Sequence, residues 1–391
     1  MTHDTVYVLP DKLGGVFNFC ANLLRHRRTG GTRYGAVLTH NRWSTDIRAG
    51  ERLPADWQTT VEEQLPAENL YAALRRVRRA VNGRGALVSH DWLGLATASA
   101  FPLERTVFAV VHGDMDYYYD LAVRHEPDVD AFVTYTEAIR RRLHELMPHR
   151  ADTIFLRRYG VEIGGRRIPV AGPLRLLYAG RVDRRKGVFD LPPIDARLRA
   201  SGVEVTWTVQ GTGPDLEELR AKWDRTDVRW TGRQTMPQVL AEYERHDVLV
   251  MPSRSEGLPV ALLEAGAAAV VPVISDLASG IPEIVRQGET GWRAPVGDIG
   301  AFAAAIETLA RDRGALERMS GCIRDVVARE WDITLNAPAY EALFDRWDEL
   351  RRHRVPGRRT PYGSLLDRRW LPNAMVKAIR AFTLRASAHV G

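Results

Sequence analysis

The sequence predicts an α/β protein made of two doubly wound domains with parallel sheets. Its 391 residues exceed the usual size of a single domain. Short apolar segments bounded by glycine or polar turns alternate with helical stretches, which is the pattern of repeated βαβ units. The segment 159–173 is dense in glycine and proline and divides this series in two, so we place the domain boundary near Pro169.

The first predicted domain, residues 1–169, holds six candidate strands separated mostly by helical segments. They are TVYVLP from Thr5, YGAVLTH from Tyr34, GALVSHD from Gly85, TVFAVVHG from Thr106, AFVTYT from Ala131 and DTIFL from Asp152. Because helical crossovers join consecutive strands in the same sense, the sheet is expected to be parallel.

The second predicted domain, residues 170–335, repeats the pattern with five strands. They are LRLLYAG from Leu174, VEVTWTVQG from Val203, DVRWTG from Asp227, VLVMPS from Val248 and VVPVIS from Val270. Beyond Ile299 the apolar residues adopt helical spacing, and residues 336–352 continue it. The basic extension 353–391 contains a predicted amphipathic helix with one apolar side, formed by Met375, Val376, Ile379 and Phe382.

Composition narrows the class of protein. Hydrophobic residues at 45% and charged residues at 27% exclude a mainly disordered or coiled-coil chain. Cys20 and Cys322 are too few for a disulfide framework or a thiolate metal cage. The first residues do not resemble a secretory signal, and the longest apolar stretch, 265–274, is about half the length of a membrane-spanning helix. We therefore expect a cytoplasmic protein without a membrane span.

The net charge of +6 permits phosphorylated ligands, anionic lipid or nucleic acid as partners. The arginines are spread along the whole chain, whereas a nucleic-acid module would concentrate them on groove-binding elements or among stacking aromatics. This distribution disfavours nucleic acid.

In doubly wound sheets, ligands bind beyond the carboxyl ends of the strands. The stretch VLVMPSRSEGLPVALLEAGA predicts a strand ending at Ser253, a turn with Glu256 and Gly257, and a helix starting at Pro259, because proline suits the first helical position. The N–H groups near Gly257 and Leu258, with the positive end of the helix dipole, would then form a phosphate site.

Glu264 lies about five residues into this helix, whereas Glu256 stays on the turn, so the two acids face different groups. On either side of an anion site they could accept hydrogen bonds from the ribose and the hexose of a nucleoside diphosphate sugar. Two solvated acids at a helix start are the alternative interpretation.

The stretch LLYAGRVDRRKG places Arg181 and Lys186 after another strand end. A leaving diphosphate gains negative charge as the glycosidic bond breaks, so fixed cations there would stabilise the transition state. A solvated basic loop is the alternative. The glycine pair of VQGTGP lacks the third glycine and the acid of a dinucleotide fingerprint, which disfavours a nicotinamide or flavin enzyme.

Together, AGRVDRRKG, VQGTGP, WTGR, PSRSEGLPVALLEAGA and DLASGIPEIVRQGETGW resemble the retaining GT-B glycosyltransferases of family 4. The resemblance spans nearly all of the second half, and KLGGVFNFCANLL and VVHGD extend it loosely into the first. It implies two facing Rossmann-like domains with a cleft between them. It also implies a C-terminal helix that crosses back to the first domain, for which residues 336–352 are the candidate.

The resemblance also implies roles for residues of the second domain. Glu264 would bind the ribose, and Glu256 with the backbone of Gly257 and Leu258 would face the donor sugar. Arg181 and Lys186 would hold the diphosphate.

Three further positions take roles from the same resemblance. Gly15 would let the backbone approach the phosphate, Arg233 would lie near the base, and His112 would approach the sugar. For His112, a hydrogen-bonded histidine at a strand end is the alternative. The turn reads Gly257, Leu258, Pro259 where many family members have phenylalanine, and the extension beyond His353 is longer than usual.

The predicted function is retaining transfer of a hexose from a nucleotide diphosphate sugar to an acceptor hydroxyl, in bacterial cell-surface polysaccharide or glycoconjugate biosynthesis. The acceptor would be a glycan, a lipid-linked glycan or a small molecule. No metal or other cofactor is expected, because Arg181, Lys186 and a helix end supply the positive charge, and Asp114 and Asp116 are assigned to the acceptor side.

Three alternatives remain open at this stage: a non-catalytic nucleotide-sugar or carbohydrate-binding protein of the same fold, a glycosyltransferase that modifies small natural products, and a nucleotide-sugar epimerase or phosphorylase with the same two-domain architecture. The tail, residues 363–391, could contact the inner face of a membrane at its periphery or dock on the first domain.

Overall fold

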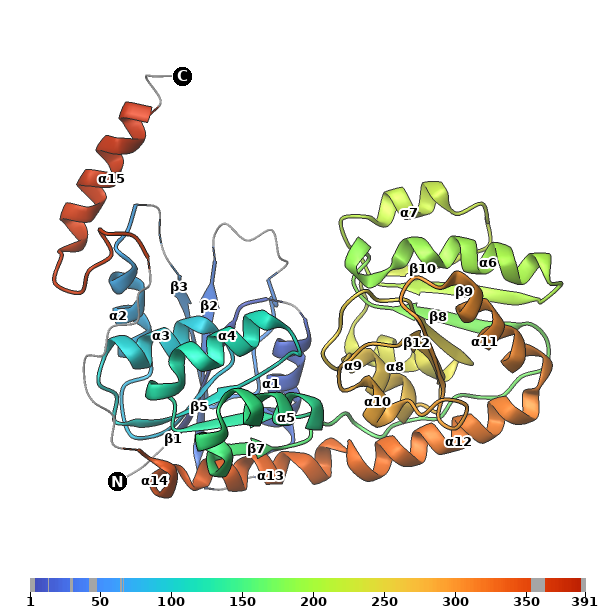
Figure 1. The fold of residues 1–391 in the computed structure, drawn as a ribbon, viewed down its shortest axis with the longest axis horizontal. Helices are drawn as coiled ribbons and strands as arrows, with labels where there is room; N and C mark the ends of the chain where they lie inside the picture. Colours follow the sequence, from blue (N-terminus) through green and yellow to red (C-terminus); the bar gives the residue numbers. More distant parts are fainter. Residues whose placement is uncertain are drawn as a thin grey trace. The chain divides into compact units, whose positions relative to one another are not determined.

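A computed structural model describes residues 4–12, 14–28, 31–41, 48–63, 65, 67–352 and 363–387. The chain forms two compact units (Figure 1). Unit 1 comprises Met1–Tyr135, Arg140–Arg157 and Ala337–Gly391, and unit 2 comprises Thr136–Ile139 and Arg158–Asn336. The long crossing into unit 2 falls between Arg157 and Arg158, so the predicted boundary near Pro169 lies within unit 2.

Unit 1 contains a seven-stranded sheet in the order β3-β2-β1-β4-β5-β6-β7. Its strands are β1 (Asp4–Pro10), β2 (Arg33–His40), β3 (Trp57–Glu62), β4 (Gly85–Ser89), β5 (Arg105–Val110), β6 (Ala131–Thr134) and β7 (Ile154–Leu156). Every pairing is parallel. Strand addition changes direction at β1, which pairs with both β2 and β4, so the carboxyl ends of β1 and β4 flank a topological switch point.

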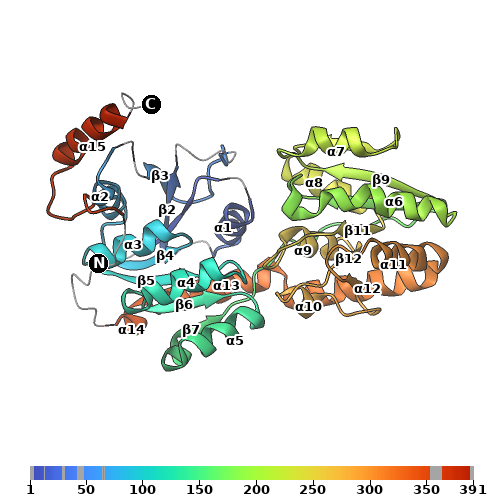
Figure 2. The same cartoon turned by 45° about the horizontal axis from the view of Figure 1, so that its top comes forward.

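The helices of unit 1 connect these strands and flank the sheet (Figure 2). They are α1 (Gly15–Arg25), α2 (Leu70–Ala80), α3 (Trp92–Ala100), α4 (Asp116–His125) and α5 (Glu137–Leu146), with 3-10 turns η1 (Glu126–Asp128) and η2 (Pro148–Thr153).

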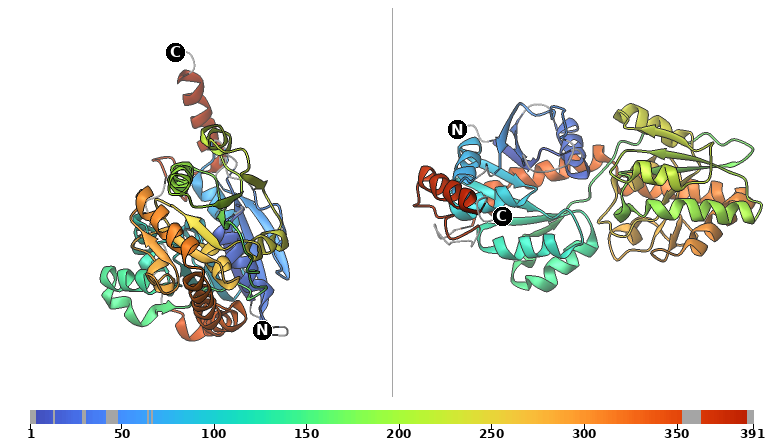
Figure 3. Two further views of the ribbon diagram at one scale, coloured as in Figure 1. Left: turned by 90° about the vertical axis from the view of Figure 1, so that its right-hand side faces the viewer. Right: turned by 90° about the horizontal axis from the view of Figure 1, so that it is seen from above.

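Unit 2 contains a six-stranded parallel sheet in the order β10-β9-β8-β11-β12-β13. Its strands are β8 (Leu174–Ala179), β9 (Val205–Gln210), β10 (Arg229–Gly232), β11 (Val248–Met251), β12 (Val271–Ser275) and β13 (Trp292–Ala294). Its helices are α6 (Leu191–Ala200), α7 (Leu216–Lys222), α8 (Met236–Glu244), α9 (Val260–Ala267), α10 (Ile281–Ile284), α11 (Ile299–Arg311) and α12 (Arg313–Glu330), with 3-10 turns η3 (Arg184–Lys186) and η4 (Val188–Asp190). The predicted fold class, two Rossmann-like units with parallel sheets, is confirmed (Figure 3).

Strands β3 and β13 were not predicted, because their sequences lack the apolar pattern of a buried strand. Within β3, WQTTVE buries only Val61, as suits a strand at the edge of a sheet. β13 has three residues and is also an edge strand.

The C-terminal helices differ from the single helix predicted over 336–352. α13 (Ile333–Asp345) starts three residues earlier, and α14 (Trp347–Leu350) is separate from it. α13 starts within unit 2 and continues in unit 1. There Tyr340 contacts the ring of Phe19, and Phe344 contacts that of Phe108. No helix in the described part of the chain is long and apolar enough to cross a bilayer.

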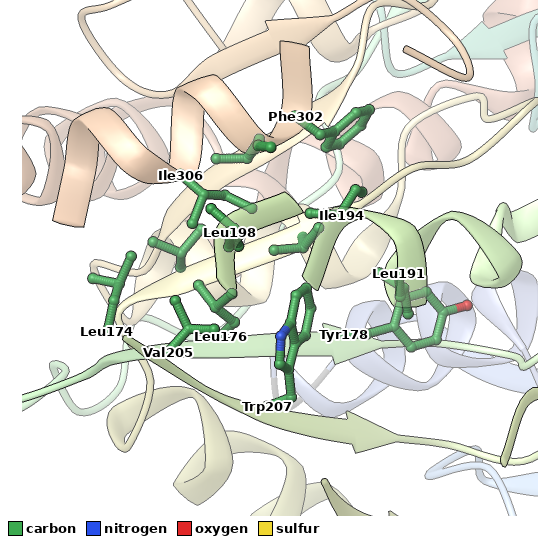
Figure 4. Close-up of a cluster of buried hydrophobic side chains, with 14 of the residues drawn as sticks. Leu174, Leu176, Tyr178, Leu191, Ile194, Leu198, Val205, Trp207, Phe302 and Ile306 are labelled. Carbon is green, nitrogen blue, oxygen red and sulfur yellow. The ribbon is translucent and has the colours of Figure 1, made fainter. Parts of the chain in front are cut away.

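The core of unit 2 shows how alternation in the strands builds the fold (Figure 4). One face of β8 and β9 points toward α6 and α11, because residues two apart in a strand share a face. Trp207 of β9 is 1% exposed, and its indole N–H donates to the Asp195 carboxylate of α6 at 2.9 Å. The largest side chain of this face is therefore both packed and hydrogen-bonded.

We predict that Trp207→Ala destabilises unit 2 by about 3–5 kcal/mol, because it leaves a cavity and removes a hydrogen bond from a buried carboxylate. Urea unfolding followed by circular dichroism measures the loss. Leu335→Ala, at a side chain that is 61% exposed, serves as the control and should change stability by less than about 0.5 kcal/mol. Equal losses in the two variants would contradict the packing described for Trp207.

Candidate functional site

The loops that follow β8 and β11 are packed together, because these strands are neighbours in the sheet. After β8 the chain forms the turn η3, in which the Asp183 carboxylate accepts hydrogen bonds from the backbone N–H groups of Arg185 and Lys186. Gly187 follows with φ 66°, and a Cβ there would lie 1.8 Å from the carbonyl oxygen of Pro252. Only glycine fits where the two loops come this close. The close approach also fixes the backbone position of the neighbouring Lys186.

Lys186 and Glu256 meet where these loops touch. The Lys186 ammonium donates to Oε1 of Glu256 at 2.7 Å, and the Ser253 hydroxyl donates to the same oxygen at 2.8 Å. The glutamate side chain is 7% exposed, whereas the lysine side chain is 30% exposed. An ammonium has three N–H donors and this pair uses one of them, so the cation stays able to bind an anion.

Arg181 lies in the same loop as Lys186, two residues beyond the end of β8. Its backbone carbonyl accepts a hydrogen bond from the Tyr178 hydroxyl at 2.6 Å. Its guanidinium lies 3.3 Å from the Asp183 carboxylate, and its side chain is 42% exposed. The backbone of Arg181 is therefore anchored while its charge faces solvent.

The turn after β11 differs by one residue from its prediction. Pro259 is the N-cap of α9, with φ −67° and an extended ψ of 125°, so the first helical residue is Val260. The proline ring fixes φ and leaves ψ free, which explains why proline marks the start of the helix only approximately. The N–H of Gly280 donates to the carbonyl of Gly257 at 3.2 Å, and Leu258 is buried.

Glu264 of α9 is buried, unlike a solvated helix-start acid. The Tyr243 hydroxyl of α8 donates to its Oε2 at 3.1 Å. Burial raises the pKa of Glu264 to about 7, partly opposed by this hydrogen bond. Its carboxyl is therefore only partly ionised at neutral pH, while Glu256 is held in an ion pair.

Arg233 follows β10 at the edge of the sheet and is exposed. The structure thus joins Lys186 to Glu256, places Arg181 in the same loop as Lys186, and places Glu264 on the helix that follows Glu256.

Sequence reasoning missed several polar groups at the same ends of the strands. Gln210 ends β9 and Ser275 ends β12, and each has a buried side-chain oxygen without a hydrogen-bond partner among the described residues. Tyr243, the donor to Glu264, was also missed. The strand-end rule could have identified Gln210 and Ser275, because both close strands that were predicted.

His112 of unit 1 lies two residues beyond β5 and is linked to a second histidine. Its Nε2 is 2.8 Å from Nδ1 of His90, which directly follows β4. Nε2 of His90 lies 3.4 Å from the thiol of Cys20 on α1. The predicted alternative, a hydrogen-bonded histidine at a strand end, describes this geometry. His90 was missed although GALVSHD places it at a strand end.

Desolvation lowers the pKa of His112 to about 3 and that of His90 well below its ordinary value. Both rings are therefore neutral at neutral pH and share one proton along their hydrogen bond. Phe19 contacts both rings. Gly15 is the first residue of α1 in the same unit.

Asp114 accepts a hydrogen bond from the Tyr119 hydroxyl, and Asp116 opens α4. In the described ranges of the chain, no cluster of three or more histidine, cysteine, aspartate or glutamate residues could hold a metal ion.

Residues 173–312 match a family model described as "Glycosyl transferases group 1". This matched region, within unit 2, belongs to the group 1 glycosyltransferases. The chain is 26% identical to a glycogen synthase of Mycobacterium tuberculosis over 281 residues, which cover 68% of each protein. It is 33% identical to the putative colanic acid biosynthesis glycosyltransferase WcaL of Salmonella typhimurium over 171 residues, 41% of this chain and 42% of WcaL.

A solved structure matches most of the chain in fold. The crystal structure of Anabaena Alr3699/HepE in complex with UDP and glucose superposes with a TM-score of 0.72 at 15% identity, covering 87% of this chain and 99% of that one. This likeness shows the fold, which is that of the GT-B enzymes.

We predict that Glu264→Gln becomes more stable relative to the wild type as the pH rises. Below about pH 4.5 the carboxyl is protonated in both the folded and the unfolded protein, so its ionisation does not change the free energy of unfolding. Between this value and about 7 the unfolded chain ionises first, so the wild type loses stability that glutamine does not lose. The difference should reach on the order of 1–3 kcal/mol.

Urea unfolding of both proteins at about pH 5 and about pH 8 measures this difference. Glu244→Gln, at the nearby end of α8, is the control. A stability difference for Glu264→Gln that stays constant with pH would show that Glu264 is ionised in the folded protein.

Proposed function

We propose that this protein is a retaining hexosyltransferase that moves a hexose from a nucleotide diphosphate sugar to an acceptor hydroxyl. The observation that carries the proposal is the contact of Lys186 with Glu256 at adjoining strand ends of unit 2, with Arg181 in the same loop as Lys186. Phosphates bind cations and sugar hydroxyls bind carboxylates, and this cluster contains both kinds of partner.

Each residue of the cluster has a proposed task. Arg181 and Lys186 stabilise the diphosphate as the bond between the anomeric carbon and the phosphate oxygen breaks. Glu256 accepts hydrogen bonds from sugar hydroxyls, and the N–H groups at the start of α9 bind a phosphate oxygen. The acceptor oxygen bonds to the anomeric carbon on the same face, and its proton passes to the departing phosphate.

The remaining predicted residues take part in the same proposal. Glu264 accepts hydrogen bonds from the ribose, which supply the polar partners that burial removes and so favour its ionised form. Arg233 lies near the base, Gly15 admits the phosphate to the backbone of unit 1, and His112 contacts the sugar. Since the cluster supplies fixed positive charge, we propose that the reaction requires no metal.

The relatives support a role in polysaccharide or glycoconjugate synthesis. WcaL is named for colanic acid biosynthesis, and HepE was solved with UDP and glucose. We propose a bacterial cell-surface polysaccharide or glycoconjugate pathway in the cytoplasm, with a glycan, lipid-linked glycan or small-molecule acceptor. Peripheral membrane contact through 363–391 is a separate proposal, since no residue of the donor site takes part in it.

A panel of UDP and GDP sugars tests the proposed reaction. Purified protein should hydrolyse one of these donors slowly without an acceptor, and nuclear magnetic resonance of the first-formed sugar should show the anomeric configuration of the donor. Binding of a nucleotide sugar without any turnover, with or without added acceptors, would instead identify a non-catalytic binding protein.

We predict that Lys186→Ala lowers the rate of donor hydrolysis by a factor of about 10²–10³, because it removes a cation from the leaving diphosphate. Lys222→Ala is the matched control, since Lys222 also pairs with a glutamate, Glu218, but on the exposed surface of α7. Thermal unfolding checks that both variants fold. Equal rates in the two variants would rule out the role proposed for Lys186.

A further inference from the structure

Exposed apolar side chains gather in the C-terminal segment 363–387. In the described part of the chain thirteen large apolar side chains are exposed, and five of them lie within residues 365–382: Leu365, Trp370, Met375, Ile379 and Phe382. Leu365 is 84% exposed, Trp370 71% and Phe382 76%. Single exposed apolar residues are ordinary, but such a concentration in one short segment marks an interaction surface.

The segment is fixed to unit 1 by a different set of residues. The Asp367 carboxylate accepts from the backbone N–H of Leu70 at 2.7 Å and pairs with Arg380 at 2.8 Å. The side-chain oxygen of Asn373 accepts from the backbone N–H of Asn69 at 2.8 Å. These contacts hold the segment against the start of α2, where α15 (Asn373–Ser387) lies in Figures 1 and 2.

α15 therefore has two distinct sides. Val376 is fully buried and Arg380 faces unit 1, whereas Met375, Ile379 and Phe382, spaced by four and three residues, form an exposed stripe. Val376 was predicted on the same apolar side as these three, but it alone of the four is buried. The two uses predicted for the tail, docking and membrane contact, thus fall on different sides of one helix.

Positive charge surrounds the exposed stripe. The segment 363–387 contains five cations, Arg368, Arg369, Lys377, Arg380 and Arg385, and one acid, Asp367. α2 adds Arg75, Arg78 and Arg79, whereas its Arg76 is paired with Glu68. The guanidinium groups of Arg78 and Arg369 lie 5.3 Å and 5.2 Å from the centre of the Phe101 ring, so α2 and the segment form one basic surface.

We propose that α2 and the segment 363–387 together bind the surface of an anionic lipid bilayer. The exposed apolar side chains enter the boundary between headgroups and acyl chains, while Arg78, Arg79, Arg369 and Lys377 pair with lipid phosphates. Nucleic acid would match the charge but offers nothing to bury the aliphatic side chains. The anchored segment orients unit 1 on the membrane, independently of the donor chemistry in unit 2.

Flotation of the full chain with vesicles tests the proposal. The protein should float with vesicles of equal parts phosphatidylglycerol and phosphatidylcholine and stay at the bottom with phosphatidylcholine alone. The triple variant Leu365→Ser, Trp370→Ser and Phe382→Ser should lower the partition coefficient about a hundredfold. Arg78→Gln with Arg79→Gln and Arg369→Gln should lower it about tenfold and reduce its dependence on salt.

The matched control replaces three exposed apolar residues of unit 2, Ile168→Ser, Val170→Ser and Leu335→Ser, and should bind vesicles like the wild type. Donor hydrolysis without vesicles should be unchanged in every variant, so a failure of the proposed reaction is seen separately from a failure of lipid binding. Circular dichroism checks that the variants fold.

The proposal is overturned if the wild type does not float, or if the serine variant and the control bind equally. It is also overturned if the wild type is a dimer that the serine substitutions dissociate while vesicle binding is absent, since the surface would then bind a second copy of the chain.

Discussion

The close approach of the loops after β8 and β11 is the constraint on which the proposed site depends. Gly187 allows the backbone of one loop to reach the carbonyl of Pro252 in the other. Because of this approach, a lysine from one loop and a glutamate from the other can form an ion pair at 2.7 Å. A bulkier residue at 187 would separate the loops, and both the cation and the carboxylate would lose their partners.

The two glutamates of EGLPVALLE illustrate how burial gives one residue type two behaviours. Glu256 has a lysine ammonium and a serine hydroxyl as hydrogen-bond partners. Glu264 has one phenolic donor in a buried environment, so its proton is held more tightly. Their spacing of eight residues places them on a turn and on the following helix, which is how one short stretch supplies both.

Much of the fold was predictable because buried parallel strands are runs of apolar residues between glycines. The strand ends then located Arg181, Lys186 and Glu256, since a ligand site must lie beyond them. Edge strand β3 was missed because an exposed strand carries polar residues. His90 was missed because its hydrogen bond is to His112, twenty-two positions further along the chain. The docked side and the exposed side of α15 could not be told apart from the sequence, since the spacing of apolar residues does not indicate which of them pack against the rest of the protein.

The retained proton of Glu264 has a consequence for the thermodynamics of ligand binding. If a nucleotide ribose donates hydrogen bonds to this carboxylate, the bound complex favours the ionised form, and complex formation near neutral pH expels a proton into the buffer. The heat recorded by titration calorimetry would then vary with the ionisation enthalpy of the buffer. The slope of that variation would count the protons released when the nucleotide enters.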